Sequence, residues 1–149
     1  MPSKKAAAAA IFGTGVLLEI PYLIPAVAGP TIQKLFGLSN TQLGICVGAG
    51  SFGAMAGALA AGHIVHRLGA FPIMVTGFLG VMAATLAGAF AFGFPSLVLG
   101  LVCMGVAAVL IGNANSSQLA DLFPDMLRRT MSFFSALWFG SWAVCAPLM

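Results

Sequence analysis

Apolar residues run along this chain in five long stretches, and polar or charged residues fall mainly between the stretches. A helix needs about 20 apolar residues to cross a hydrocarbon core that is ~30 Å thick. Stretches of that length predict membrane-spanning helices over approximately residues 6–28, 41–65, 71–93, 95–118 and 129–149. What remains is a short amino-terminal tail and four connections. We therefore expect a single all-α integral membrane domain over residues 1–149.

The composition excludes a soluble domain. Of the 149 residues, 60% are hydrophobic and 6% are charged, whereas about 25% of the residues in an ordinary soluble domain are charged. Six basic and three acidic side chains cannot cover the surface of a soluble protein of this length. The expected partner is therefore the lipid bilayer. Nucleic acid is not expected as a partner, because the basic residues are isolated or paired and form no stripe.

The positions of lysine and arginine predict the orientation of the chain, since positively charged connections stay on the cytoplasmic side. With the amino terminus in the cytoplasm, Lys34 is outside, and the other five of the six basic residues are inside: Lys4, Lys5, Arg67, Arg128 and Arg129. We therefore expect a multi-pass protein of the cell membrane whose carboxy terminus lies outside. The connection over residues 29–40 and a tight turn at Phe94-Pro95-Ser96 also lie outside in this topology.

An alternative interpretation of the first stretch is a cleavable signal peptide, because two lysines precede it and Ala26-Val27-Ala28 is similar to a small-residue cleavage site. Glu19, Pro21 and Pro25 interrupt the apolar residues just before that position. Four further apolar stretches then follow. This pattern favours a helix that is retained in the membrane.

Small residues in the second stretch predict close helix packing, which in a membrane depends on van der Waals contact between backbones. Gly44 and Gly48, and then Gly53 and Gly57, recur at a spacing of four residues. Alanines and Gly62 lie beside them. We expect this face to meet another helix, and the pattern by itself indicates packing rather than a specific function.

The first stretch carries the clearest functional candidates, Glu19 and Tyr22. Pro21 and Pro25 donate no backbone hydrogen bonds, so the helix should bend or loosen and should face protein, water or a ligand rather than lipid. Glu19 is the acidic residue inside an apolar stretch, about 20 Å from its cytoplasmic end. An ionisable group at such depth is by default part of a proton or solute path. The alternative is a protonated carboxyl group that hydrogen-bonds a neighbouring helix and takes no part in turnover.

A second group of polar residues follows the fourth apolar run, namely Asn113, Asn115, Ser116, Ser117 and Gln118. Counted from Pro95, Asn113 lies about 27 Å from the outer face, which is close to the cytoplasmic surface and well below Glu19. Glu19 and Asn113 are therefore not expected to form one compact site. The group either lines an inner vestibule or is a wetted helix end, and the sequence favours the wetted end.

Other residue types give no sign of an enzyme, a cofactor or a metal site. His63 and His66 are three residues apart without an evident third ligand. The three cysteines, Cys46, Cys103 and Cys145, lie in apolar runs and are expected to be small buried hydrophobes. Trp138 and Trp142 share a helix face, where packing or lipid contact is expected and stacking on a solute is the alternative.

Three segments resemble the amino-terminal half of a major facilitator superfamily transporter. Phe36-Gly37-Leu38-Ser39-Asn40-Thr41-Gln42-Leu43-Gly44 is similar to the family's approach to its second helix. Gly62-His63-Ile64-Val65-His66-Arg67-Leu68-Gly69 is similar to its signature between helices two and three, with His66 in place of the acidic residue and Ala70 and Phe71 in place of the following basic residues. Leu119-Ala120-Asp121-Leu122-Phe123-Pro124, leading to Arg128, resembles its connection between helices four and five.

The resemblance implies a role for each group of candidates. In the family, the first and fourth helices line the central cavity, and these helices carry Glu19 with Tyr22 and the Asn113 group. The signature segment implies a gating loop formed by Gly62, His66, Arg67 and Gly69, in which the acidic member of the contact is missing. Family members contain two six-helix halves built from inverted repeats. The five helices expected here imply that a second half or a partner subunit is needed for transport.

The leading hypothesis is a secondary active transporter, or its amino-terminal part, that moves a small solute by alternating access and is coupled to protons through Glu19. The alternative is a small membrane protein, or a truncated and inactive gene product, whose glycine-rich faces bind other helices. The coding sequence downstream of Met149 discriminates between them. Seven further predicted spans would favour the transporter, and a stop codon would favour the alternative.

The predicted topology is tested by compartment-specific reporter fusions. A reporter after Leu68 is expected in the cytoplasm, and a reporter after Phe94 is expected outside, because the chain crosses the membrane between them. Detection of both reporters in one compartment would contradict the topology.

Overall fold

The structure is a computed structural model that describes residues 4–126 and 128–136, with the exception of the side chains of residues 5, 16, 17 and 19–26. In this part of the chain, five helices follow one another, and a 3-10 turn precedes a further helical segment over residues 128–136. Their bounds are Lys4–Val27 (α1), Gly29–Phe36 (α2), Asn40–Leu68 (α3), Ala70–Ala89 (α4), Phe94–Leu122 (α5) and Pro124–Met126 (η1).

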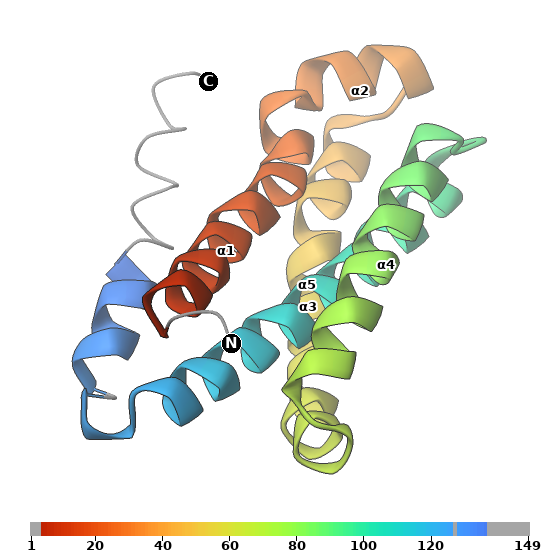
Figure 1. Cartoon of the computed structure of the whole chain (residues 1–149). Helices are drawn as coiled ribbons and strands as arrows, with labels where there is room; N and C mark the ends of the chain where they lie inside the picture. Colours follow the sequence, from red (N-terminus) through yellow and green to blue (C-terminus); the bar gives the residue numbers. More distant parts are fainter. Residues whose placement is uncertain (1–3, 127, 137–149) are drawn as a thin grey trace.

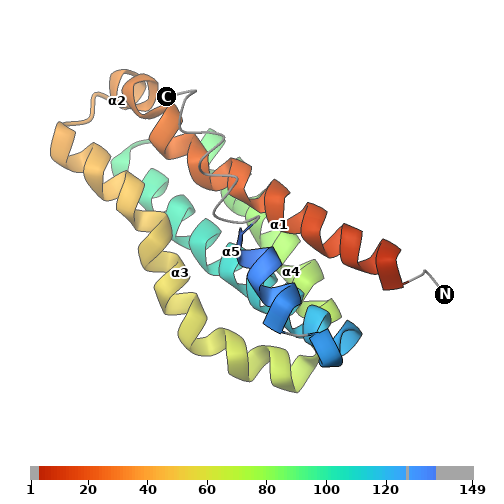
Figure 2. The ribbon, with the colours of Figure 1, turned by 90° about the vertical axis from the view of Figure 1, so that its left-hand side faces the viewer.

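The long helices cross the molecule in alternating directions, with α5 packed between α3 and α4 and with α1 on another of its sides (Figure 1). Three described helices, α3, α4 and α5, are long and apolar enough to cross a membrane. The start of α1, the ends of α3 and α5, and the segment over residues 128–136 lie at one end of the bundle (Figure 2). That end carries Lys4, Arg67, Arg128 and Arg129, whereas Lys34 lies in α2 at the opposite end.

The turn between α4 and α5 differs from the sequence-based expectation. The predicted turn at Phe94-Pro95-Ser96 is the first turn of α5, and the chain reverses over residues 90–93 instead. Proline is tolerated in the first helical turn because the backbone N–H groups there have no intrahelical partner. Ser96 stabilises this helix start, since its hydroxyl accepts from the Phe92 N–H at 3.0 Å and donates to the Gly93 carbonyl at 2.9 Å.

The connection over residues 29–40 contains a helix that the sequence analysis missed, α2. Pro30 lies in its first turn, and Gly37 ends it in the left-handed conformation with φ 60°. Ser39 then begins α3 through reciprocal hydrogen bonds with Gln42. Ile32 and Phe36 of α2 pack against a buried cluster of Leu38, Cys46 and Leu97. The sequence predicted only a connection here because an eight-residue helix with one apolar face contains no apolar stretch of membrane length.

The first helix continues through both of its internal prolines. α1 is α-helical from Lys4 to Val27, so neither Pro21 nor Pro25 interrupts it, contrary to the expected loosening. Each proline removes one backbone hydrogen bond, and the intact bonds on either side are sufficient to continue the helix. Since 24 residues rise about 36 Å, α1 is long enough to cross the membrane.

The contact between α3 and α5 brings two backbones together at glycine positions. A Cβ atom at Gly53 would overlap the carbonyl group of Val102, and one at Gly105 would overlap the carbonyl group of Gly50. One turn further, a Cβ at Gly57 would lie 2.7 Å from Val109 Cγ1. No side chain fits at these positions unless the two helices move apart. This close contact confirms the packing role predicted for Gly53 and Gly57.

Gly44, Gly48 and Gly62 do not take part in this contact, and the prediction that they share one face with Gly53 and Gly57 is wrong. They are exposed, and a Cβ at any of them would meet no atom within 4 Å. The spacing between Gly48 and Gly53 is five residues, which rotates the helix by about 140° from one glycine to the next. The two pairs of glycines therefore lie on nearly opposite faces of α3.

We predict that Gly53→Leu destabilises the bundle and that Gly48→Leu does not. The leucine at position 53 must displace α5, and such overpacking costs about 1–3 kcal/mol or more. The melting midpoint of the detergent-purified chain, followed by size-exclusion chromatography after heating, should fall by about 3 °C or more. Gly48→Leu is the matched control in the same helix. Equal midpoints for the two variants would show that the α3–α5 contact does not depend on the missing side chain.

Candidate solute-binding cavity

The polar residues near the end of α5 lie inside the helix rather than at its end. α5 continues to Leu122, and the residues from Asn113 to Gln118 are buried or half-buried. The interpretation of this group as a wetted helix end is therefore wrong. The sequence analysis placed the end of the span at the first polar residues, but the helix extends beyond the apolar stretch because other helical segments cover it.

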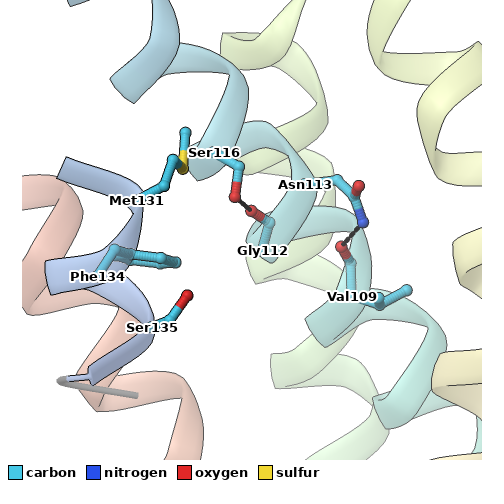
Figure 3. Close-up of a pocket in the computed structure, with 7 residues that line it drawn as sticks. All are labelled: Val109, Gly112, Asn113, Ser116, Met131, Phe134 and Ser135. Atoms are coloured by element: carbon cyan, nitrogen blue, oxygen red, sulfur yellow. Dashed lines mark hydrogen bonds between the residues drawn. The ribbon is translucent and has the colours of Figure 1, made fainter. Parts of the chain in front are cut away.

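Asn113 lines a cavity between α5 and residues 128–136, with a volume of about 290 Å³ (Figure 3). The α5 wall contains Val109, Gly112, Asn113 and Ser116. The opposite wall contains Met131, Phe134 and Ser135. The cavity thus combines an amide and two hydroxyl groups with apolar surface, which is typical of sites for small organic molecules.

Two of these polar side chains are bonded to carbonyl groups of their own helix. Asn113 Nδ2 donates to the Val109 carbonyl at 2.9 Å, and Ser116 Oγ donates to the Gly112 carbonyl at 3.0 Å (Figure 3). Each bond engages one proton, so both oxygens keep the capacity to accept a hydrogen bond. Ser135 presents a second hydroxyl group from the other wall. The geometry can therefore hold a solute that donates hydrogen bonds.

Aromatic contacts hold the second wall of the cavity against α1. The ring of Phe12 lies 5.5 Å from the ring of Phe133 and 5.8 Å from that of Phe134, measured between centroids. Phe134 is also part of a buried cluster with Ile11 and Leu119. The cavity wall is thus supported by both α1 and α5, although its residues come from a later segment of the chain.

The structure adds Thr14, a hydrogen-bond partner of Asn115, to the polar residues near the cavity. Asn115 is fully buried, and its Nδ2 donates to Thr14 Oγ1 at 3.2 Å. Asn113 and Asn115 are two residues apart, so they point to different sides of α5. The sequence grouped them as neighbours, and only the helical rotation separates the one that lines the cavity from the one that faces α1.

Glu19 and Tyr22 lie on α1, but their side chains are outside the described part of the structure. Their predicted roles, and the statement that Glu19 and Asn113 form no compact site, stay predictions. Trp138 and Trp142 lie outside the described residues as well.

The signature segment ends α3 and begins α4. Gly62, His66 and Arg67 are exposed in the last turns of α3, and no described acidic residue forms an ion pair with Arg67. Gly69 joins the two helices with φ 83° and ψ 159°, a backbone conformation that residues with a Cβ rarely adopt. The glycine at this position is therefore required by the turn itself, whatever the gating role of its neighbours.

Two further cavities are mainly apolar. One, of about 780 Å³, lies between α4 and α5, and the other, of about 350 Å³, lies among α2, α4 and α5. The larger cavity includes Cys103, which is exposed and not buried as expected, whereas Cys46 is buried. Cys145 is not among the described residues. Although the cavity near Asn113 is smaller, its polar residues make it the stronger candidate for binding a solute.

Long apolar helices that cross in alternating directions are typical of a polytopic membrane protein. Residues 6–149 match the model of the Major Facilitator Superfamily. The chain therefore belongs to the major facilitator superfamily, whose members are transporters and not enzymes. The family and the all-α membrane fold predicted from the sequence are confirmed. A search of curated proteins gave no match.

The cavity is tested by thiol labelling of a variant of the chain in which the native cysteines are replaced. Ser116→Cys places a thiol in the cavity lining, whereas Leu119→Cys places one at a fully buried position one turn away in the same helix. We expect a membrane-impermeant methanethiosulfonate to label the Ser116→Cys variant several times faster than the Leu119→Cys variant in membrane vesicles. Equal labelling rates would indicate that the cavity is closed to water.

Proposed function

We propose that this chain is the amino-terminal part of a secondary transporter of the cell membrane, which moves a small solute by alternating access. The observation that carries the proposal is the polar cavity beside α5 in a chain that belongs to a transporter family. The cavity, at about 290 Å³, has room for a small organic molecule. Asn113, Ser116 and Ser135 would hold its polar groups.

A complete transport path requires a second wall. Transporters of this architecture bind their solute between two structural repeats that rock against each other. We infer that a second half faces the cavity, either as a further segment of the same polypeptide or as a partner subunit. The chain in isolation is then expected to bind solute weakly and to transport none, because the path has only one wall.

Glu19 is the proposed site of coupling to protons. A carboxyl group in a membrane span that also contains Pro21 and Pro25 is poorly suited to contact with lipid. Tyr22 follows Glu19 by nearly one turn of α1 and would lie beside it on the same side of the helix. In this proposal, the carboxyl group binds a proton in one orientation of the transporter and releases it in the other.

The turn between α3 and α4 is the proposed gating loop, with a reduced set of charges. Arg67 would contact acidic groups of the same membrane side, while His66 replaces the acidic residue of the family signature. Lys4, Arg128 and Arg129 lie at the same end of the bundle. We infer from this distribution of charge that the amino terminus and the gating loop are cytoplasmic.

The alternative function, a membrane protein that only binds other helices, is favoured by one observation. Gly44, Gly48 and Gly62 lie on an exposed apolar face of α3, together with Met55 and Leu59, and a Cβ at any of these glycines meets no atom within 4 Å. A second transporter half would also cover such a face. Transport measurements therefore separate the two functions better than binding measurements.

The function is tested with the polypeptide encoded by the native reading frame, reconstituted with any subunit that co-purifies. Vesicles loaded with a pH-sensitive dye are given a panel of polyols, amino acids, dicarboxylates and organic cations. We expect one solute class to enter and to move protons with it. Asn113→Leu should raise the apparent KM of that class by about two- to tenfold, because it removes one solute hydrogen bond of about 0.5–1.5 kcal/mol.

Glu19→Gln is expected to stop the proton movement in this assay while solute exchange at equal pH continues, because an amide cannot bind and release a proton. Thr41→Ser, at the exposed start of α3, is the control. Proton movement that persists in Glu19→Gln would remove the coupling role. Failure of all solutes to enter would favour the helix-binding alternative.

A further inference from the structure

Asn115 is a buried polar side chain at the contact of α1 and α5, and no other is fully buried in the described part of the chain. Ile111 and Leu119, one turn before and one turn after it, are also fully buried. They belong to apolar clusters with Leu18 and Ile11 of α1, respectively. A polar group among such neighbours is costly unless its hydrogen bonds are satisfied.

The hydrogen bonds of Thr14 fix which way the Asn115 amide points. The Thr14 hydroxyl donates its single proton to the Ile11 carbonyl at 2.8 Å. Toward Asn115 it can therefore only accept, and the group at 3.2 Å must be the amide nitrogen. The amide oxygen, Oδ1, consequently points away from Thr14. Among the described residues, none donates a hydrogen bond to this oxygen.

A buried acceptor without a hydrogen-bond donor lowers the free energy of unfolding by about 1–3 kcal/mol. Leucine or alanine at position 115 would avoid the cost, and the apolar neighbours on both sides are compatible with either. Packing alone does not explain why an asparagine stands here. A donor that reaches the amide oxygen during the transport cycle does explain it.

Phe134 relates this acceptor to the proposed solute cavity. Gly112 and Ser116, three residues before and one residue after Asn115, line the cavity, and so does Phe134. The edge of the Phe134 ring lies 3.0 Å from the position of a Cβ at Gly15, the residue that follows Thr14. The ring thus lies over the α1 backbone beside the Thr14–Asn115 pair, where the absence of a Gly15 side chain gives it room.

We propose that Asn115 Oδ1 is a specificity-determining acceptor of the solute path, covered by Phe134 and reached when this ring turns away from Gly15. The site then selects solutes that carry a hydroxyl, amine or amide N–H group over solutes that only accept hydrogen bonds. A solute without a donor leaves the buried oxygen unpaired, and sites of this kind discriminate strongly against such analogues. The inference rests on the proposed transport function.

The geometry is tested first, without reference to transport. In a chain free of native cysteines, Asn115→Cys should react slowly with a membrane-impermeant methanethiosulfonate, and the additional change Phe134→Ala should make it react several times faster. Phe52→Ala, a change to an exposed ring of α3, is the control and should leave the rate unchanged. If removal of Phe134 does not expose the thiol introduced by Asn115→Cys, the acceptor is not behind this ring and the proposal is overturned.

The selectivity is tested with paired probes in proteoliposomes that contain the reconstituted transporter. Each pair consists of a solute with a hydroxyl or amide N–H group and its fully methylated analogue, an ether or tertiary amide, which accepts hydrogen bonds but does not donate them. We expect Asn115→Leu to reduce the preference for the donor by about three- to tenfold, the effect of one hydrogen bond. Leu18→Ala weakens the same contact between α1 and α5 but leaves the Thr14–Asn115 bond that orients Oδ1, so the preference of this variant should remain.

The outcomes separate the possible failures. If Leu18→Ala and Asn115→Leu lower the melting midpoint equally and neither changes the preference, the Thr14–Asn115 pair only joins two helices and the proposal is overturned. If the thiol of Asn115→Cys becomes accessible without Phe134 but the unmodified protein takes up no probe, the proposed transport function fails, and the selectivity role fails with it. Uptake by the unmodified protein with unchanged selectivity in Asn115→Leu overturns the selectivity role alone.

Discussion

The backbone contact between α3 and α5 is the constraint on which the rest of the bundle depends. In lipid, apolar side chains gain little by leaving their surroundings, so helices associate where small residues allow close approach. Here Gly53 and Gly105 remove the side chains that would otherwise separate the two helices. Gly77 of α4 repeats the arrangement, since a Cβ there would overlap the side chain of Ile111. Both neighbours are thereby fixed against α5, which becomes the central helix of the described bundle.

The position of the cavity follows from this arrangement. The contact with α3 continues past Val109 to Ala114, which is buried in one cluster with Val65 of α3. Asn113 and Ser116 line the cavity that α5 shares with residues 128–136. Close packing and the solute cavity therefore occupy different sides of one helix. This arrangement explains how a helix that is tightly held along its length can still line a space.

The sequence predicted the helices well because apolar stretches of membrane length are long and distinct. It located the α3 contact at Gly53 and Gly57. It wrongly assigned Gly48 to the same face, because the spacing from Gly48 to Gly53 is five residues and not four, and the extra residue rotates the helix to another face. The short helix α2 was missed because its eight residues contain no apolar stretch of membrane length. The cavity was found only in part, since Asn113 was a candidate while the residues of its second wall, Phe134 and Ser135, come from a segment that no spacing connects to α5.

α1 and α5 are joined by a hydrogen bond between side chains, whereas α3 and α5 are joined by backbone contact at glycines. The two kinds of contact differ in how easily the helices can move relative to each other. Two backbones in contact at glycines have one favourable distance, and separation loses many van der Waals contacts together. The Thr14–Asn115 bond is directional, and it uses only the donor half of the amide. An interhelical hydrogen bond of this kind within a membrane is worth only about 0.6 kcal/mol on average. The pair can therefore set the register of α1 while leaving Phe134 and the amide free to change partners, as a solute path requires.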